Sequence, residues 1–155
     1  ALKGSRKKPI KASEVGWEVL PVALPPSPHL DEAKLLARIE DKSAKTAARA
    51  DAAGELIWLR RCKAGEKIDV TCLRLGSARV LNMPGELFVE YQLAAQRMRP
   101  DLFVAMTAYG DYGPCYIGTE VAYAEGGYET SPTSSLTAPS VEKVLTDAMR
   151  ELLKK

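Results

Sequence analysis

The 155-residue sequence predicts an α/β fold, with α+β as the alternative, in which a mixed sheet is flanked by helices. Apolar and polar residues alternate over 68–75, which is typical of a strand, and apolar residues recur at helical spacing over 141–153. Between them, residues 102–108 form a short and almost continuous apolar run, as in a buried central strand. Strands and helices therefore alternate along a chain of single-domain length.

The N-terminal residues 1–14 are expected to form a basic flexible arm or connector. Five basic residues fall within the first eleven positions: Lys3, Arg6, Lys7, Lys8 and Lys11. Such a run suits either a contact with phosphate or lipid head groups or a solvated tail, and the lack of an interleaved aromatic residue favours the tail. Residues 17–24 then predict a short extended segment, which Pro21 places at the edge of a sheet.

A helix is expected to begin at Asp31, whose side chain can cap the first turn, and to continue through the Ala-rich run 44–53. Gly54 is expected to break or kink this helix. A second helical piece would then bury the four side chains of residues 56–59 and end by Gly65.

A β-hairpin is predicted where the strand at 68–75 meets the turn Gly76-Ser77 and returns over 78–83. The returning strand runs into Pro84-Gly85-Glu86, which we expect to open a helix with one apolar face. That face contains Leu87, Tyr91, Ala94, Ala95 and Met98. Pro100 is expected to close this helix.

The chain ends in its clearest amphipathic helix, which Ser140 is expected to cap. One side of this helix is apolar: Val141, Val144, Leu145, Ala148, Met149, Leu152 and Leu153. Residues 109–128 contain too few periodic apolar residues for a regular element. No second domain and no internal repeat is visible.

The composition excludes several classes of function. Lys and Arg total 22 against 20 Asp and Glu, and a net charge of only +2 argues against a dedicated nucleic-acid binder. No stretch approaches the ~18 consecutive apolar residues of a membrane span. The three cysteines are far apart and fit neither a disulfide framework nor a CxxC metal site. Because the first residue is Ala1, we expect the sequence to be a piece of a longer chain.

The first candidate site is Pro84-Gly85-Glu86, at a strand-to-helix junction of the kind where ligands gather in α/β sheets. In the first turn of a helix, Glu86 would face unpaired N–H groups that keep its carboxylate ionised. It is then a metal ligand, a general base or an ordinary helix-terminal residue, and its position alone favours the last of these.

The second candidate site is the Gly- and Tyr-rich stretch 109–129. It holds five of the six tyrosines of the chain: Tyr109, Tyr112, Tyr116, Tyr123 and Tyr128. A tyrosine can donate a hydrogen bond to a developing oxyanion, bind a metal as a phenolate, or simply pack its ring. No pattern supports His29 as a metal ligand or Cys115 and the nearby serines as nucleophiles.

The two candidate sites combine into one longer motif. It consists of residues 81–86 with the following helix and strand, and then Tyr116-Ile117-x-Thr119-x-x-x-Tyr123-x-x-x-x-Tyr128-Glu129. In this combination the sequence resembles the neutral/alkaline non-lysosomal ceramidase family, particularly its bacterial ceramidase-like members. The resemblance covers roughly residues 17–153 and is sharpest over 76–128.

The resemblance implies a zinc-dependent amide hydrolase that cleaves an N-acyl amide of a lipid-like substrate, such as a sphingolipid. Family members hold zinc with two histidines, one glutamate and one tyrosine, and the motif makes Glu86 and Tyr116 the last two. The motif likewise makes Tyr128 the tyrosine that hydrogen-bonds the reacting carbonyl. The two histidines and an Asn-x-Gly-Asp-x-Ser-Pro motif of the family lie upstream and have no counterpart here.

Residues 15–155 are therefore expected to be the C-terminal half of a catalytic domain, with the upstream half of the same protein supplying two zinc ligands and the general base. The isolated chain should bind zinc weakly and be inactive, because two oxygen ligands cannot close a tetrahedral site. The resemblance also implies a periplasmic or secreted location. The alternative is a non-catalytic binding or interaction module, in which the apolar helix faces at 87–98 and 141–153 bury a partner surface.

Overall fold

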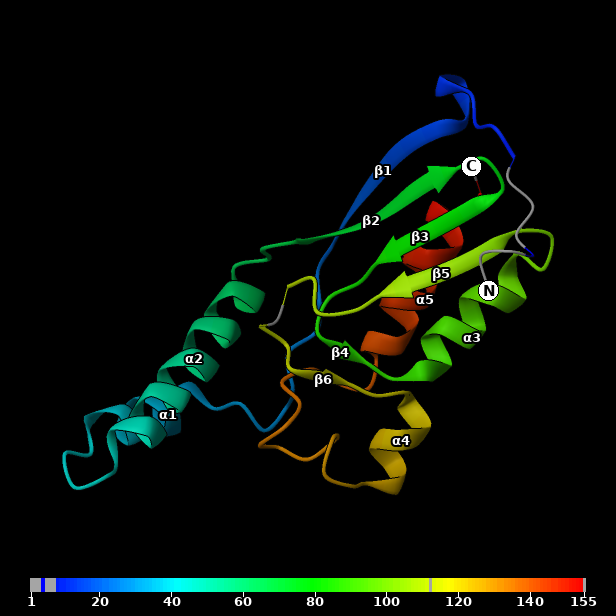
Figure 1. The fold of residues 1–155 in the computed structure, drawn as a ribbon. Coiled ribbons are helices and arrows are strands. Elements are labelled where there is room, and N and C mark those ends of the chain that lie inside the picture. Colours follow the sequence, from blue (N-terminus) through cyan, green and yellow to red (C-terminus); the bar gives the residue numbers. More distant parts are fainter. Residues whose placement is uncertain (1–3, 5–7, 112, 155) are drawn as a thin grey trace.

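A four-stranded mixed sheet with the strand order β1-β2-β3-β5 forms the centre of the computed structural model, which describes residues 4, 8–111 and 113–154 (Figure 1). β1 (Val15–Val22) pairs antiparallel with β2 (Ile68–Leu75), and β2 pairs antiparallel with β3 (Ala78–Asn82). β5 (Phe103–Thr107) runs parallel to β3. The predicted mixed sheet, its hairpin and the edge position of the first strand are confirmed.

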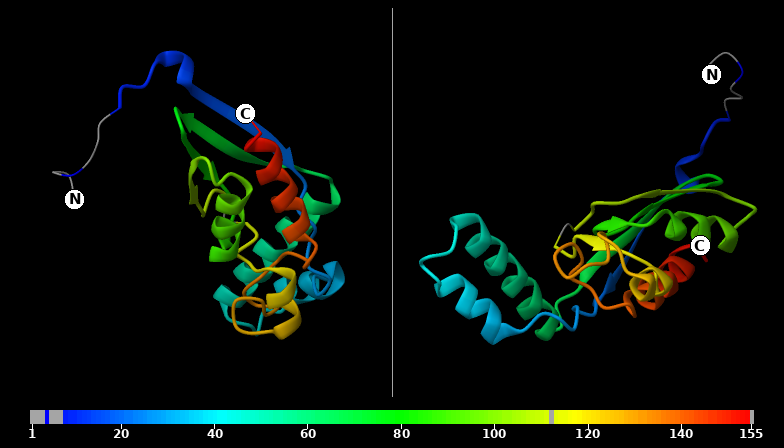
Figure 2. Two further views of the ribbon diagram at one scale, coloured as in Figure 1. Left: turned by 90° about the vertical axis from the view of Figure 1, so that its right-hand side faces the viewer. Right: turned by 90° about the horizontal axis from the view of Figure 1, so that it is seen from below.

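Two helices, α3 (Val89–Met98) and α5 (Val141–Leu152), cover one face of this sheet (Figures 1 and 2). The apolar sides predicted for them face the core, where Tyr91, Leu145 and Met149 are at most 2% exposed. The helix faces that the interaction-module alternative assigned to a partner are therefore occupied by the sheet of the same chain.

The other two long helices, α1 (Glu32–Glu40) and α2 (Thr46–Lys63), form a hairpin that projects from the rest of the fold (Figure 2). The carboxylate of Asp31 accepts a hydrogen bond from the Lys34 amide at 2.9 Å, which confirms the predicted cap. Trp58 of α2 joins this hairpin to the rest of the fold, because its indole N–H donates to the carbonyl of Leu136 at 2.9 Å.

The helix break predicted at Gly54 is wrong, because α2 runs through that residue without interruption. The break lies earlier, where the Asp41 carboxylate accepts from the amide of Ser43 at 2.9 Å and from its hydroxyl at 2.6 Å. This local turn competes with helical hydrogen bonding and ends α1. Ile57, predicted to pack inward, is 61% exposed, whereas Trp58 is buried.

The start of the helix after Pro84 also differs from expectation. Glu86 lies in a short strand, β4 (Glu86–Leu87), that pairs in parallel with β6 (Tyr116–Ile117), and α3 begins only at Val89. Glu86 is therefore not in the first turn of a helix, where the helix dipole was expected to keep its carboxylate ionised. The carboxylate is positioned by strand pairing instead.

Two further expectations are corrected. β5 lies at the edge of the described four-stranded sheet and not at its centre, and Phe103 is 70% exposed. The Tyr-rich stretch is not irregular throughout: besides β6 it contains α4 (Glu120–Glu125), whose first turn is capped by the Thr119 hydroxyl accepting from the amide of Ala122 at 3.2 Å.

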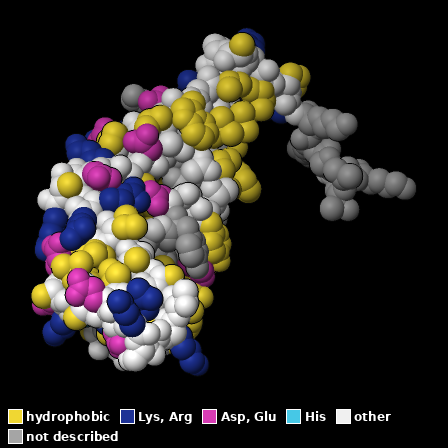
Figure 3. Space-filling view, turned by 90° about the vertical axis from the view of Figure 1, so that its left-hand side faces the viewer, with side chains coloured by type: hydrophobic (Ala, Val, Ile, Leu, Met, Phe, Trp, Pro, Cys, Tyr) yellow, Lys and Arg dark blue, Asp and Glu magenta, His cyan; other side chains and the backbone are white. Residues whose placement is uncertain are grey.

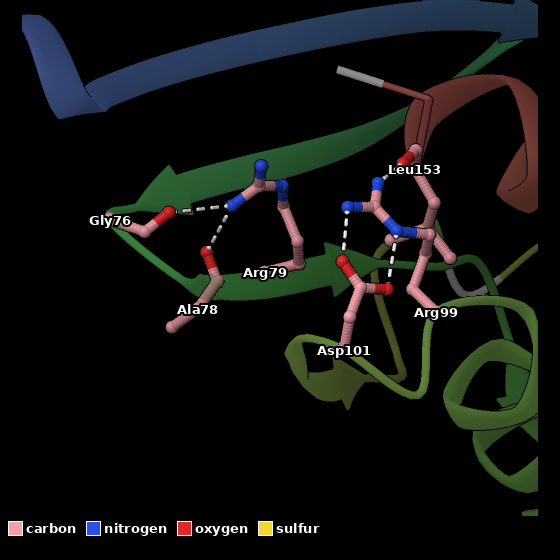
Figure 4. A network of polar contacts seen from close by, with 6 residues as sticks. All are labelled: Gly76, Ala78, Arg79, Arg99, Asp101 and Leu153. Atoms are coloured by element: carbon pink, nitrogen blue, oxygen red, sulfur yellow. Dashed lines mark hydrogen bonds and ion pairs between the residues drawn. The ribbon is translucent and has the colours of Figure 1, made fainter.

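Two neighbouring groups of polar contacts lie where the β2–β3 hairpin and α5 end (Figure 4). The buried Arg79 guanidinium donates to the carbonyls of Gly76 at 2.9 Å and Ala78 at 3.0 Å, and burial lowers the pKa of this group. Beside it, Arg99 pairs with Asp101 at 2.8 Å and donates to the carbonyl of Leu153. These contacts satisfy main-chain carbonyls where the hairpin and α5 both end.

The N-terminal basic arm is only partly within the described residues. Lys3, Arg6 and Lys7 lie outside them, whereas Lys8 and Lys11 are described and exposed. Residues Ala12–Glu14 form one turn of 3-10 helix just before β1. Among the described residues, no helix has the length and apolar character needed to cross a membrane.

Candidate functional site

The central feature of the site is the pairing of Glu86 with Tyr116. These residues are 30 positions apart in the sequence and directly opposite each other in the β4–β6 ladder. The Glu86 amide donates to the carbonyl of Cys115 at 2.8 Å, which fixes the register. The Tyr116 hydroxyl donates to the Glu86 carboxylate, and this hydrogen bond raises the pKa of the phenol. Two side chains whose oxygens can bind a hard metal ion therefore lie side by side on the paired strands.

Two glycines allow the loops that carry this pair to approach each other. Gly85 has a φ of +61°, and a Cβ at this position would lie 2.5 Å from the carbonyl oxygen of Cys115. A Cβ at Gly110 would lie 2.8 Å from the carbonyl oxygen of Met83, to which the Gly110 amide donates at 2.9 Å. The Tyr109 amide also donates to the carbonyl of Gly85 at 2.7 Å. Only glycine fits such close contacts between backbones.

On its other side, β6 is held by a cluster of buried hydroxyls. Ser135 Oγ donates to the Tyr116 carbonyl at 2.8 Å. The Tyr123 hydroxyl lies 2.7 Å from Ser135 Oγ and 2.8 Å from Thr137 Oγ1. Ser135 and Thr137 are 2% and 1% exposed, so these bonds are shielded from water. Ser135 thus positions the backbone of Tyr116, a role that sequence reasoning did not find because no pattern distinguishes it from neighbouring loop serines.

Glu86 and Tyr116 face an open groove of about 420 Å³. The groove is lined by carboxylates, tyrosines and apolar side chains: Glu86, Leu87, Phe88, Val89, Glu90, Tyr109, Tyr116 and Glu129. Sequence reasoning gave no role to Glu129, although it stands beside Tyr128 in the motif. Tyr109 was named only as one of the five tyrosines of the candidate stretch, and its left-handed backbone, with φ of +65°, has no signature in the sequence.

Tyr128 lies next to this pair. Its ring meets the Tyr116 ring edge to face, with centroids 6.1 Å apart and an angle of 71° between the planes. The side chain is 69% exposed, so it remains accessible to a molecule that enters from solvent. The structure therefore brings together all three residues that the motif singled out. Tyr112, another tyrosine of the stretch, lies outside the described residues.

The donor set fits part of a metal site. A carboxylate and a phenol oxygen in direct contact suit two positions of a zinc ion, which takes oxygen, nitrogen and sulfur ligands. Across the described ranges, no three His, Cys, Asp or Glu side chains gather closely enough to hold a metal. The single histidine, His29, has its Nδ1 2.5 Å from the Ser27 hydroxyl, and burial lowers its pKa.

Cys115 and the serines behave as structural residues. The Cys115 thiol is half-buried, and this burial raises its pKa above the ordinary value of 9.0, which is the reverse of what a nucleophilic thiol needs. Ser134 and Ser135 are buried, and Ser131 donates to the carbonyl of Tyr128 at 2.7 Å.

Comparison with known proteins finds similarity at the level of the fold. No family model matches the sequence, and no curated protein does. Neutral ceramidase from Pseudomonas aeruginosa matches with a TM-score of 0.56 and 16% identity, over 90% of this chain and 28% of that one. A ceramidase complexed with C2 matches with a TM-score of 0.48 and 21% identity, over 56% of this chain and 14% of that one. The chain thus has the fold of part of neutral ceramidase and spans little more than a quarter of its length.

Proposed function

We propose that this chain is the C-terminal half of the catalytic domain of a zinc-dependent hydrolase that cleaves an N-acyl amide of a lipid-like substrate. The observation that carries the proposal is the contact between the Glu86 carboxylate and the Tyr116 hydroxyl, beside the exposed Tyr128. The neutral-ceramidase-like fold supports it. A periplasmic or secreted location belongs to the same proposal.

Each of the three residues has a distinct role in this proposal. Glu86 and Tyr116 hold two of the four zinc positions, and the upstream half of the protein supplies the other two. Zinc, when bound in such a site, supplies a Lewis acid and lowers the pKa of water. The Tyr128 phenol donates a hydrogen bond to the oxygen of the amide carbonyl, on which negative charge develops during attack.

The groove also supports an amphiphilic substrate. Leu87, Phe88 and Val89 line the same opening as the carboxylates, and Val89 is 64% exposed. An acyl chain can contact these apolar side chains while its amide lies near Glu86 and Tyr128. A small polar amide would leave this apolar surface uncovered, which is unfavourable.

The experiment uses the native protein that carries this chain and measures both zinc content and the release of a fatty acid from an N-acyl sphingoid amide. We expect Glu86→Gln to lose zinc and activity together. Tyr128→Phe should keep its zinc and lower kcat by roughly 100- to 1000-fold, as removal of an oxyanion donor does. Glu125→Gln, which changes an exposed carboxylate on α4, is the matched control and should leave both unchanged.

Normal turnover in Glu86→Gln, or loss of zinc in Tyr128→Phe, would contradict these assignments. A second candidate function is a non-catalytic module derived from the same fold, which the same assay separates from the hydrolase. Such a module would bind the amide in the groove and release no fatty acid in the same assay.

A further inference from the structure

The sheet has a second face, opposite α3 and α5, on which the strands present apolar side chains. In β1, the alternation of side chains places Val15, Trp17 and Val19 on this face, and they are 47%, 56% and 48% exposed. At the opposite edge, Phe103 of β5 is 70% exposed. Both helices that pack on the four-stranded sheet lie on its other side.

The strand register shows that these residues form continuous rows. One row crosses all four strands through Val15, Leu75, Ala78 and Phe103. The next row crosses through Trp17, Leu73, Val80 and Ala105. We call these eight residues the open face. They carry no charge, and Figure 3 shows hydrophobic side chains gathered in the upper part of the molecule, on the side that faces the reader in Figure 1.

A third row is polar and leads toward the candidate site. It runs from Val19 through Thr71 and Asn82 to Thr107, and the Asn82 side-chain amide donates to Thr71 Oγ1 at 3.0 Å. Asn82 and Thr107 are the last residues of β3 and β5. The chain continues from Asn82 to Glu86 within four residues. The polar end of this face is therefore adjacent in sequence to the groove.

A face of this composition is unfavourable in water. Aromatic side chains such as those of Trp17 and Phe103 bury roughly 150–250 Å² each when they are covered. Together with the valines, they give the open face an apolar area on the order of several hundred Å². Contiguous apolar patches of that size mark interaction surfaces. Two rows of uncharged side chains on a pleated sheet form the kind of surface against which a second β-sheet packs. The two sheets then lie about 10 Å apart, and their side chains interdigitate.

We propose that the open face packs against a β-sheet layer supplied by the upstream half of the same protein. This inference rests on the proposed function, in which that half exists and completes the zinc site. A layer on the open face that extends past Asn82 and Thr107 would approach the groove that Glu86 and Tyr116 line. A second copy of the chain would bring only another Glu86 and Tyr116.

The comparison with neutral ceramidase supports an occupant from the same polypeptide, because a protein of this fold extends well beyond the part that this chain matches. The chain matches only 28% of the Pseudomonas aeruginosa neutral ceramidase, with 90% of its own length. The occupant is therefore assigned to the same polypeptide and not to a separate partner.

Hydroxyl-radical footprinting of the native protein, read by mass spectrometry, tests this inference. The oxidation rates of Trp17 and Phe103 are measured in the native protein and after denaturation in urea. We expect both residues to be protected at least tenfold on folding. Ile57, which is 61% exposed on α2 and far from the open face in sequence, is the control and should be protected less than twofold.

Protection of Trp17 and Phe103 no greater than that of Ile57 would overturn the inference. Protection that disappears on dilution, together with halving of the particle mass in light scattering, would also overturn it, because the occupant would then be a second copy. A second variant gives an independent reading: Trp17→Lys should lower the Tm of the native protein, whereas Ile57→Lys should leave it nearly unchanged.

This readout is separate from that of the proposed function. Protected Trp17 in a protein without zinc or amide turnover would uphold the covering layer and reject the chemistry. Turnover in a protein whose Trp17 is oxidised at the denatured rate would uphold the chemistry and reject the layer.

Discussion

At Gly85, the left-handed backbone and the carbonyl of Cys115, 2.5 Å from where a Cβ would lie, leave no room for a side chain. We expect Gly85→Ala to destabilise the chain by about 2 kcal/mol or more, since the left-handed conformation alone costs a non-glycine residue roughly 1–2 kcal/mol. Gly54 is the matched control: it lies inside α2, and a Cβ there meets nothing within 4 Å.

Gly54→Ala should therefore stabilise the helix by about 0.5–1 kcal/mol. Urea unfolding of both variants measures the two effects, which have opposite signs. Equal stability of Gly85→Ala and the wild type would mean that the contact between β4 and β6 is not as close as described.

The Tyr123 hydroxyl is the second residue-scale feature with a measurable consequence. Because it bonds buried hydroxyls of Ser135 and Thr137, Tyr123→Phe should cost about 1–3 kcal/mol of unfolding free energy. Ser131→Ala removes an exposed hydroxyl of the same segment and should cost less than about 1 kcal/mol. Thermal unfolding compares the two, and a cost for Tyr123→Phe no larger than that for Ser131→Ala would show that the hydroxyl cluster does not support β6.

The motif grouped residues that the structure brings together, but it did not predict their surroundings. Motif spacing paired Glu86 with Tyr116, and the structure places them in contact. The physical reason given for Glu86, a position in the first turn of a helix, was wrong. Parallel pairing between two-residue strands has no periodicity that a sequence pattern could show. Ser135 was missed for the same reason, since its role depends on a contact 19 residues away.

At the scale of elements, the α1–α2 hairpin is tied by Glu32, which accepts from Lys63 at 3.0 Å and from Arg60 at 2.9 Å. The hydrogen bond from Lys63, followed by that from Arg60, lowers the pKa of Glu32 below its ordinary value of 4.5. A carboxyl group whose folded pKa is lowered contributes stability that is complete above its unfolded pKa and is lost as the pH falls through the folded value.

We therefore expect the wild type to lose more stability than Glu32→Gln when the pH is lowered from 6 to 3 at low salt. Urea unfolding at the two pH values gives the comparison. Other carboxyls with lowered pKa values, such as Asp101 and Asp147, contribute equally to both proteins and cancel in the difference. Parallel pH dependence of the two proteins would contradict the assignment.

Element boundaries were predictable where one strong local signal acted alone. Asp31 capped α1 as expected, and the hairpin turn at Gly76 fixed β2 and β3. The prediction failed at Gly54 because glycine lowers helix propensity only slightly, whereas the Asp41–Ser43 turn replaces helical hydrogen bonds outright. The edge position of β5 could not be read from its apolar run, because the hydrophobicity of a strand does not show how many neighbouring strands it pairs with.

At the scale of the whole molecule, we propose one common explanation for the open face and for the two-ligand donor set, which is polypeptide beyond this chain. The 155 residues alone should bind zinc only weakly, because two oxygen donors cannot close a tetrahedral site. Competition with a chromogenic zinc chelator measures this affinity. Tight, stoichiometric zinc in the isolated chain would show that its own residues complete the site.

The most direct test of the central claim is the intact mass and zinc content of the native protein purified from its source, measured on the same sample and on its Glu86→Gln variant. The account predicts a mass several-fold above 16.9 kDa, with one zinc per chain that the variant loses. A mass near 16.9 kDa, or zinc that stays bound in the variant, would contradict it.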